Sequence, residues 1–294
     1  MITYFQAIVM GLLQGITELF PVSSLGHSVL FPSLFGWHNL VRAQSQPESF
    51  FLAFLVALHV GTALALLAVF WHEWVDIISA FFRSIAKRKI ETANERLAWL
   101  LVIATIPAGI LGIALEHELR VLFAKPEAAA LFLISNGLIL AAGERLRRRA
   151  EVRELAIARG LKPEEDARRL ETMDYKEAGV IGVAQTGALL AGISRSGITM
   201  VAGLVRGLDH EDAARFSFLL ATPIILAAGV YKIPDLMGSL GNGVRGQALV
   251  GGLFAAVAAF ISTKFLLRYF ETRTLTPFAI YCLLFGVAMA IRFA

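Results

Sequence analysis

Long apolar runs are the feature that most constrains how this chain can fold. A helix needs about 20 predominantly apolar residues to cross the hydrocarbon core of a bilayer. Six runs approach or reach that length, and they predict spanning helices over residues 50–71, 97–115, 127–143, 212–230, 247–267 and 277–293. Only 17% of the residues are charged, whereas soluble domains have about 25%. The sequence therefore predicts an all-α integral membrane protein, with residues 1–294 forming a single membrane domain.

Two further apolar segments are interrupted by polar residues, proline and glycine. They cover residues 4–35 and 178–205, and neither contains an unbroken run long enough to span simply. Non-helical backbone at membrane depth is tolerated only where protein or a water-filled cavity surrounds it. We therefore expect two broken, re-entrant helical hairpins that enclose a polar pocket.

The two broken segments align with each other at a constant offset of 171 residues. Gln14 matches Gln185, and Gly26 matches Gly197. Three predicted spans follow each segment, and an odd number of spans inverts the second copy relative to the first. Inverted repeats whose broken helices meet near the midplane are typical of transporters. The sequence thus predicts an inverted-topology repeat.

Lysine and arginine are concentrated in alternate loops. Seventeen lie in residues 83–96, 145–176 and 268–276, against four in 116–126 and 231–246. Cytoplasmic loops carry an excess of these residues, so the first set is expected to be cytoplasmic. The net charge of +4 could suggest a protein that binds nucleic acid, but the clustering of the basic residues in alternate loops argues against this function.

The predicted repeats cover about 1–144 and 178–294. A charged cytoplasmic segment, 145–177, joins them. Because this segment carries many acidic as well as basic residues, we expect a solvated amphipathic helix or hairpin at the membrane surface.

Glu18 stands in otherwise apolar sequence in the first broken segment. An ionised carboxylate there costs at least about 2.5–3.5 kcal/mol, so a metal ion, a cationic partner or a wet cavity must offset it. Gln14 is four residues away on the same helical face. The two could share a divalent cation whose shell is completed by water and phosphate. The alternative is an ion pair between Glu18 and Arg195 without a metal.

A short loop rich in hydroxyl groups follows Pro21. It contains Ser23, Ser24 and His27, and we expect Ser23 to bind the substrate phosphate. Either Ser24 or His27 could act as a nucleophile, or one could activate the other. The alternative is that the serines cap the next helix and that His27 is a polar residue with satisfied hydrogen bonds.

Arg195 is the corresponding charged residue of the second broken segment. Its planar fork of donors matches a phosphate group. A helix that opens at Gly197 would direct its N-terminus at an anion. Neighbouring hydroxyl groups that could add hydrogen bonds to phosphate belong to Ser194, Ser196 and Thr199.

These motifs resemble those of a known family. The pattern at residues 14–27 resembles the first signature of the undecaprenyl-pyrophosphate phosphatases, the bacitracin-resistance family, and residues 192–199 resemble the second. The resemblance covers nearly the whole chain. It implies a phosphatase of the bacterial inner membrane that uses a divalent cation, Mg2+ or Ca2+. Its pocket would open to the outer face, its substrate would be a polyprenyl pyrophosphate, and its product would return to cell-wall synthesis.

The same resemblance implies roles for individual residues. Glu18 corresponds to the acidic residue associated with metal and catalysis, and Gln14 stands where some members have glutamate. Ser24 and His27 correspond to the candidates for nucleophile or acid–base catalyst, and Arg195 to the phosphate-binding arginine. The choice among Ser24, His27 and water as nucleophile stays open.

A transporter or flippase for a polyprenyl phosphate is the alternative function. It would need the arginine and the hydroxyl groups but no nucleophile. Membrane lipids are expected to surround the chain, and a homo-oligomer is compatible with the sequence. His59 and Asn136 lie in predicted spans, where we expect them to make interhelical hydrogen bonds rather than take part in chemistry.

Overall fold

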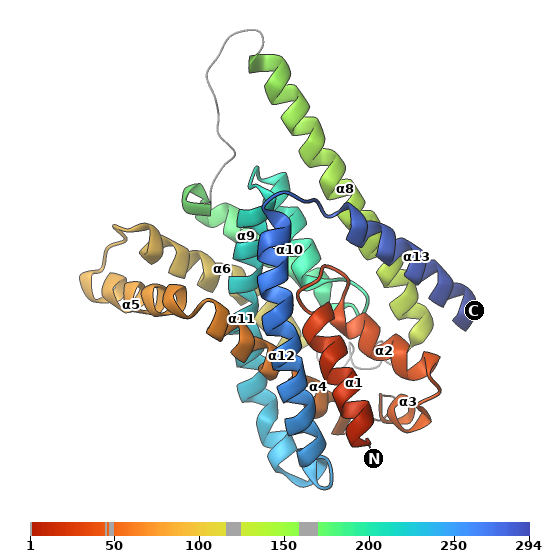
Figure 1. Cartoon of the computed structure of the whole chain (residues 1–294). Helices are drawn as coiled ribbons and strands as arrows, with labels where there is room; N and C mark the ends of the chain where they lie inside the picture. The colour runs from red at the N-terminus through yellow and green to blue at the C-terminus, as the bar shows by residue number, and fades with distance from the viewer. Residues whose placement is uncertain (1, 45, 47–49, 116–124, 159–169) are drawn as a thin grey trace.

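The computed structural model describes residues 2–44, 46, 50–115, 125–158 and 170–294. Within these ranges the regular structure is entirely helical (Figure 1). Six of the described helices are long and apolar enough to cross a membrane, which confirms the predicted all-α membrane class. They are α4 (Phe50–Val69), α6 (Ala93–Ala114), α8 (Pro126–Ala158), α11 (His210–Met237), α12 (Arg245–Phe270) and α13 (Thr276–Phe293).

The two broken segments are interrupted where the sequence places polar residues. The first forms α1 (Tyr4–Thr17) and α2 (Ser24–Leu34). The second forms α9 (Tyr175–Ala184), the short helix η2 (Gln185–Leu189) and α10 (Arg195–Val205). A positive φ marks each break, +70° at Ser23 and +118° at Gly192.

The two breaks have the same capping geometry at the offset of 171 residues. The Ser23 hydroxyl accepts from the backbone N–H of Gly26 at 3.2 Å, at the start of α2. The Ser194 hydroxyl accepts from the N–H of Gly197 at 3.1 Å, at the start of α10. The capping role offered for the serines of the first loop is therefore present at Ser23, and Ser194 caps its helix in the same way.

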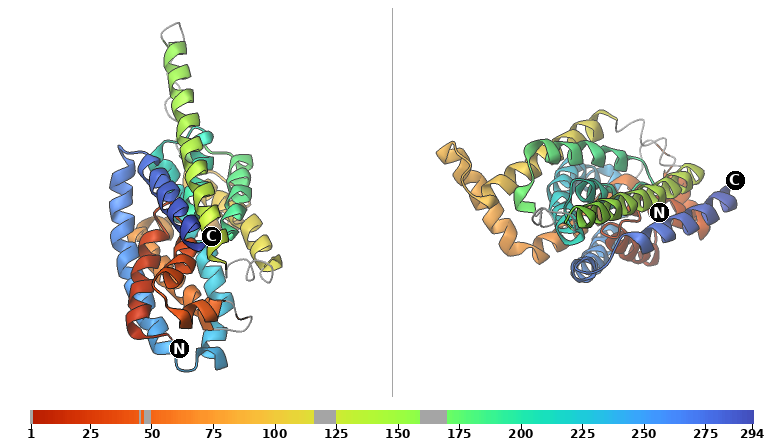
Figure 2. Two further views of the ribbon diagram at one scale, coloured as in Figure 1. Left: turned by 90° about the vertical axis from the view of Figure 1, so that its right-hand side faces the viewer. Right: turned by 90° about the horizontal axis from the view of Figure 1, so that it is seen from above.

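Helix packing follows a matching pattern in the two halves. Helix α1 packs along α12 and α9 packs along α6, while α4 meets α11 and α8 meets α13 (Figures 1 and 2). A Cβ at Gly11 would lie 2.2 Å from the carbonyl oxygen of Gly251, and one at Gly182 would lie 2.6 Å from that of Ala104. Gly11 and Gly182 are again 171 residues apart. The inverted repeat stays a prediction, and these paired contacts support it.

The structure defines the helices around the charged loops. Residues 71–87 form the helix α5 (Trp71–Lys87), which was not predicted and which projects from the bundle (Figure 2). Residues 145–158 are helical, one of the two forms expected for this segment, and they continue α8 without a break (Figure 1). Residues 159–169 of the same predicted segment lie outside the described residues. The shorter elements are α3 (His38–Gln44), η1 (Leu170–Thr172) and η3 (Ser239–Gly241).

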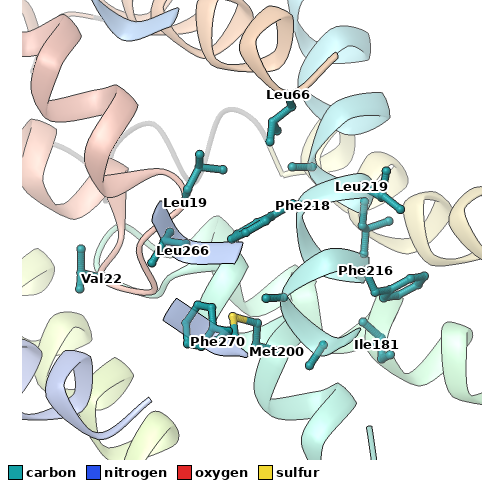
Figure 3. Close-up of a cluster of buried hydrophobic side chains, with 14 of the residues drawn as sticks. Leu19, Val22, Leu66, Ile181, Met200, Phe216, Phe218, Leu219, Leu266 and Phe270 are labelled. Atoms are coloured by element: carbon teal, nitrogen blue, oxygen red, sulfur yellow. The ribbon is translucent and has the colours of Figure 1, made fainter. Parts of the chain in front are cut away.

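A cluster of buried apolar side chains fixes α11 at the centre of the bundle. Phe216 and Phe218 of α11 pack in this cluster with Leu66 of α4 and Leu266 of α12 (Figure 3). Dispersion contacts of this kind are a main source of helix association in lipid, where the hydrophobic effect between helices is weak. The cluster therefore holds Ser217, which lies between the two phenylalanines, at a fixed place beside the two breaks.

Candidate active site

The two breaks are tied directly to each other. The Ser23 hydroxyl also accepts from the backbone N–H of Gly192, at 3.1 Å. Asn136 of α8 donates to the carbonyl of Pro21 and accepts from the N–H of Ser194, both at 2.9 Å. Asn136 thus makes the interhelical hydrogen bonds expected of it, and it satisfies one orphan backbone group in each loop. A change at any of these residues would shift both loops together.

Glu18 is the hub of the polar groups at the breaks. Its Oε1 accepts from Arg195 Nη2 at 2.9 Å. Its Oε2 accepts from the Ser24 hydroxyl and, at 3.0 Å, from Gln14 Nε2. His59 Nε2 lies 3.3 Å from the same Oε2. The ion pair with Arg195, which the sequence offered as the alternative to a metal, is therefore present.

Arg195 begins α10 and has donors left for a ligand. Its Nη1 donates to the carbonyl of Ser217 at 3.2 Å, and its side chain is 14% exposed. A guanidinium has five N–H groups, and the contacts to Glu18 and Ser217 use two of them. The positive N-terminus of α10 lies at the same place. The arrangement favours an anion in front of the guanidinium.

A cavity of about 420 Å³ opens in front of this cluster. Its volume lies in the range of sites that hold small-molecule ligands. One end is polar, and most of the remaining wall is aliphatic side chains and glycines from α4, α6, η2 and α11, with Tyr231 and Lys232 of α11 also lining it. The polar side chains at that end belong to Glu18, Ser23, Ser24, His59, Gln185, Ser194 and Arg195. The site is therefore suited to an anion attached to an apolar body.

His27 is not among the residues that line this cavity. It is fully buried, and its Nδ1 donates to the carbonyl of Ser23 at 2.7 Å. When the ring is neutral and Nδ1 carries its proton, Nε2 accepts from the Tyr281 hydroxyl, which lies 2.7 Å away. The ring lies nearly parallel to those of Tyr281 and Phe285. The geometry thus gives His27 a contact with the strained Ser23 but none with the hydroxyl of Ser24.

Three of the predicted phosphate ligands lie behind the cavity wall. The hydroxyl groups of Ser196 and Ser194 are 3.0 Å apart. Thr199 Oγ1 lies 2.7 Å from Ser217 Oγ, and the N–H of Gly197 is engaged by the Ser194 cap. These contacts hold α10 against α11. Of the predicted phosphate ligands, Ser23, Ser194 and Arg195 line the cavity.

His59 is the residue of this cluster that sequence reasoning missed. It lies within α4, where its Nδ1 is 2.8 Å from the carbonyl of Leu55 while Nε2 faces Glu18. Because a carbonyl and a carboxylate both only accept, an imidazolium with a proton on each nitrogen satisfies both. Its one signal in the sequence is an ionisable residue inside an apolar span.

The residues present fit a divalent cation only with help from a ligand. The described part of the chain contains no group of three or more histidine, cysteine, aspartate and glutamate side chains. Gln14 Oε1, however, is buried without a hydrogen-bond partner, and it belongs to the side chain that touches Glu18. Two oxygen donors suit Mg2+, which usually keeps several waters and takes substrate phosphate oxygens as further ligands.

The fold is that of a multi-pass membrane protein, and the geometry gives it a candidate anion site between two broken helices. Residues 7–288 match the family model of the bacitracin resistance protein BacA, and the chain belongs to this family. It is 55% identical to undecaprenyl-diphosphatase 2 of Frankia alni, over all of this chain and 98% of that protein. It is 53% identical to the undecaprenyl-diphosphatases of Mycolicibacterium paratuberculosis and Mycobacterium avium, again over all of this chain and 98% of each relative. These matches confirm the family resemblance found in the two motifs.

Proposed function

We propose that this protein hydrolyses undecaprenyl pyrophosphate to undecaprenyl phosphate and inorganic phosphate. The contact of Glu18 with both Ser24 and Arg195, at the polar end of an apolar cavity, carries this proposal. The names of the relatives support the same substrate. The reaction returns the lipid carrier to cell-wall synthesis, and it accounts for the bacitracin resistance in the family's name.

Binding begins with the terminal phosphate in front of Arg195. The free N–H groups of the guanidinium, the Ser194 hydroxyl and the N-terminus of α10 supply donors and positive charge to it. Arg195 also holds Glu18, so the incoming phosphate and the carboxylate share one cation. This arrangement places the carboxylate next to the reacting phosphorus without leaving its charge unbalanced. Fixed positive charge around the transferring group accounts for most of the rate in phosphoryl transfer.

Ser24 is the proposed nucleophile because its hydroxyl already donates to Glu18. As Ser24 Oγ forms a bond to the terminal phosphorus, Glu18 takes the hydroxyl proton. The bridging P–O bond breaks, and its electron pair leaves with undecaprenyl phosphate. Glu18 then passes this proton to solvent water. A water molecule attacks the phosphorus of the phosphoserine and gives one proton to Glu18. The P–Oγ bond breaks, Ser24 Oγ takes the proton from Glu18, and inorganic phosphate leaves with the remaining OH of the water. A water activated directly by Glu18 is the alternative path, and it uses the same carboxylate.

A divalent cation, Mg2+ or Ca2+, is part of the proposal. Glu18 and Gln14 would hold it, and it would neutralise charge on the pyrophosphate. We further propose that the protein lies in the bacterial inner membrane and that the cavity opens to the outer face. The distribution of lysine and arginine among the loops supports this orientation. The transporter alternative finds no support in the comparisons, whose names describe phosphatases.

Phosphate release from undecaprenyl pyrophosphate by the purified protein in detergent tests the function. We expect release that depends on Mg2+ or Ca2+ and stops with EDTA. Replacing Ser24 with alanine should lower kcat about 10⁶-fold, the size of loss found when a serine nucleophile is removed from a catalytic unit. Ser28→Ala is the matched control, since Ser28 lies on the same helix outside the cavity and its buried hydroxyl has no partner.

The outcomes of this assay separate the alternatives. If Ser24→Ala stops release but Ser28→Ala does not, Ser24 acts at the reaction centre. Trapping of a phosphoserine at Ser24 by rapid acid quench would then distinguish the nucleophile from a binding group. A Ser24→Ala protein with full activity would instead leave water activated by Glu18. Well-folded wild-type protein that releases no phosphate with either cation contradicts the proposed function.

A further inference from the structure

Part of helix α6 presents glycine to open space. A Cβ at Gly109 would meet no atom within 4 Å, and at Gly112 the nearest is Leu189 Cδ2 at 3.8 Å. Membrane helices commonly use glycine so that two backbones can approach closely. That reason holds at Gly11 and Gly182, where a Cβ would overlap a neighbouring backbone. It does not hold at Gly109. There, the absence of a side chain leaves unoccupied space beside the helix.

This room belongs to the cavity that ends at Glu18 and Arg195. Gly109 and Gly112 line it together with Ala108 and Ile113 of the same helix. The facing walls are equally apolar, formed by Leu52, Leu55 and Val56 of α4 and by Ile224, Ile225, Ala227 and Ala228 of α11. No group on this stretch can hydrogen-bond a phosphate by its side chain. The α11 wall continues to Tyr231 and Lys232, which also line the cavity. An apolar groove therefore leads away from the anion site and lies between it and these two residues.

The groove is long enough for a chain attached to the anion. Helix α11 follows it from Ser217, whose carbonyl contacts Arg195, to Ala228 in the far wall. Eleven residues of helix correspond to about 16 Å. A ligand with its phosphate at Arg195 can thus extend an apolar chain past the glycines of α6.

On the basis of the proposed function, we propose that the face of α6 formed by Ala108, Gly109, Gly112 and Ile113 binds the isoprene units next to the pyrophosphate. The cavity volume of about 420 Å³ is that of a site for a drug-sized ligand. Only the units nearest the headgroup fit in it, and the rest of the undecaprenyl chain lies in lipid. The protein therefore recognises the start of the chain and not its full length.

Leucine at position 109 tests this assignment, with leucine at position 179 as the matched control. Gly179 lies in α9, outside the cavity, and a Cβ there also meets nothing within 4 Å. Both changes put leucine in a helix interior, where it is favoured over glycine. Kinetics of phosphate release are measured with farnesyl pyrophosphate and with undecaprenyl pyrophosphate. Gly109→Ala is added because it fills less of the groove.

We expect Gly109→Leu to lower kcat/KM about 10–200-fold for both substrates, mainly through KM, as an altered apolar pocket does. Gly109→Ala should lie between it and the wild type, and Gly179→Leu should match the wild type. Equal losses in Gly109→Leu and Gly179→Leu, or no loss in either, would overturn the assignment while the wild-type activity upholds the function. A wild type without activity on either substrate would remove the proposed function, and the assignment with it.

Discussion

Replacing Glu18 with glutamine keeps the shape of the side chain but removes the charge that Arg195 and His59 face. Glu18 is 7% exposed and Arg195 14%. Removing one partner of such a buried pair costs about 3–5 kcal/mol, because the other charge stays buried without compensation. Arg195→Met should cost less than Glu18→Gln, since His59 remains 3.3 Å from the carboxylate. The double variant removes both charges of the pair, so its cost should fall below the sum of the single costs.

The coupling between the two changes is the quantity to measure. Contacting residues show interaction energies of about 0.5–3 kcal/mol, and we expect the upper end for this pair because it is buried. The free energy of unfolding is obtained for the wild type, both single variants and the double variant by titration with SDS, followed by circular dichroism. The exposed pair Lys87–Glu91, at 3.2 Å, provides the control cycle. It should give only about 0.3–0.5 kcal/mol.

The catalytic activity, unlike the stability, should not recover in the double variant. In the proposed mechanism Glu18 and Arg195 act on the same transferred phosphate, so the double variant should be about as inactive as either single variant. Part of the stability would return in the double variant and none of the activity. If instead the two stability costs simply add, the charges do not interact in the folded protein, and the geometry that places them 2.9 Å apart is wrong.

Three further predictions concern the supporting residues. Gln14→Glu adds a second carboxylate beside Glu18, so the Mg2+ concentration for half-maximal phosphate release should fall; an unchanged metal titration would place the cation elsewhere. Ser194→Ala removes the cap of α10 and should lower the free energy of unfolding by about 1 kcal/mol, measured by the same SDS titration; no change would show that the cap is dispensable. Gly11→Ala forces a methyl group onto the backbone of Gly251, and such overpacking costs about 1–3 kcal/mol. Gly179→Ala, with open space around it, should cost nothing in the same titration, and equal costs for the two would contradict the close contact.

The sequence was sufficient for the spanning helices because their signal is local. An apolar run of about 20 residues has few folds available to it in lipid. Helix α5 was not predicted because it lacks this local signal. Its apolar residues alternate with charged ones, so it lacks a continuous run, and only one face, with Trp74 and Ile77, is buried. The continuity of α8 through residues 145–158 was not predicted, because nothing in these residues distinguishes a separate surface helix from a continuing one.

The part of the site that could be predicted is the pair of charged residues, because a charge within apolar sequence requires a compensating partner. Glu18 and Arg195 stood out because each interrupts apolar sequence, and the structure brings their side chains together. The positions of His27 and His59 depend instead on how α2 and α4 are rotated about their axes. That rotation is set by packing against helices far away in the sequence, such as α13 with Tyr281. The residue types alone carry no information about it.

The ion pair at the centre of the site joins two residues that the ribosome adds to the chain at very different times. Glu18 and Arg195 are 177 positions apart in the chain. At about 5–20 residues per second, the ribosome adds the arginine roughly 9–35 seconds after the glutamate. Throughout that interval the nascent first half enters the bilayer with a carboxylate that has no guanidinium to meet it. In that interval the cationic partner available within the first half is His59, 3.3 Å from Glu18 in the folded protein. A chain truncated before Arg195 would therefore keep the acid within the bilayer with one of its two cationic partners missing.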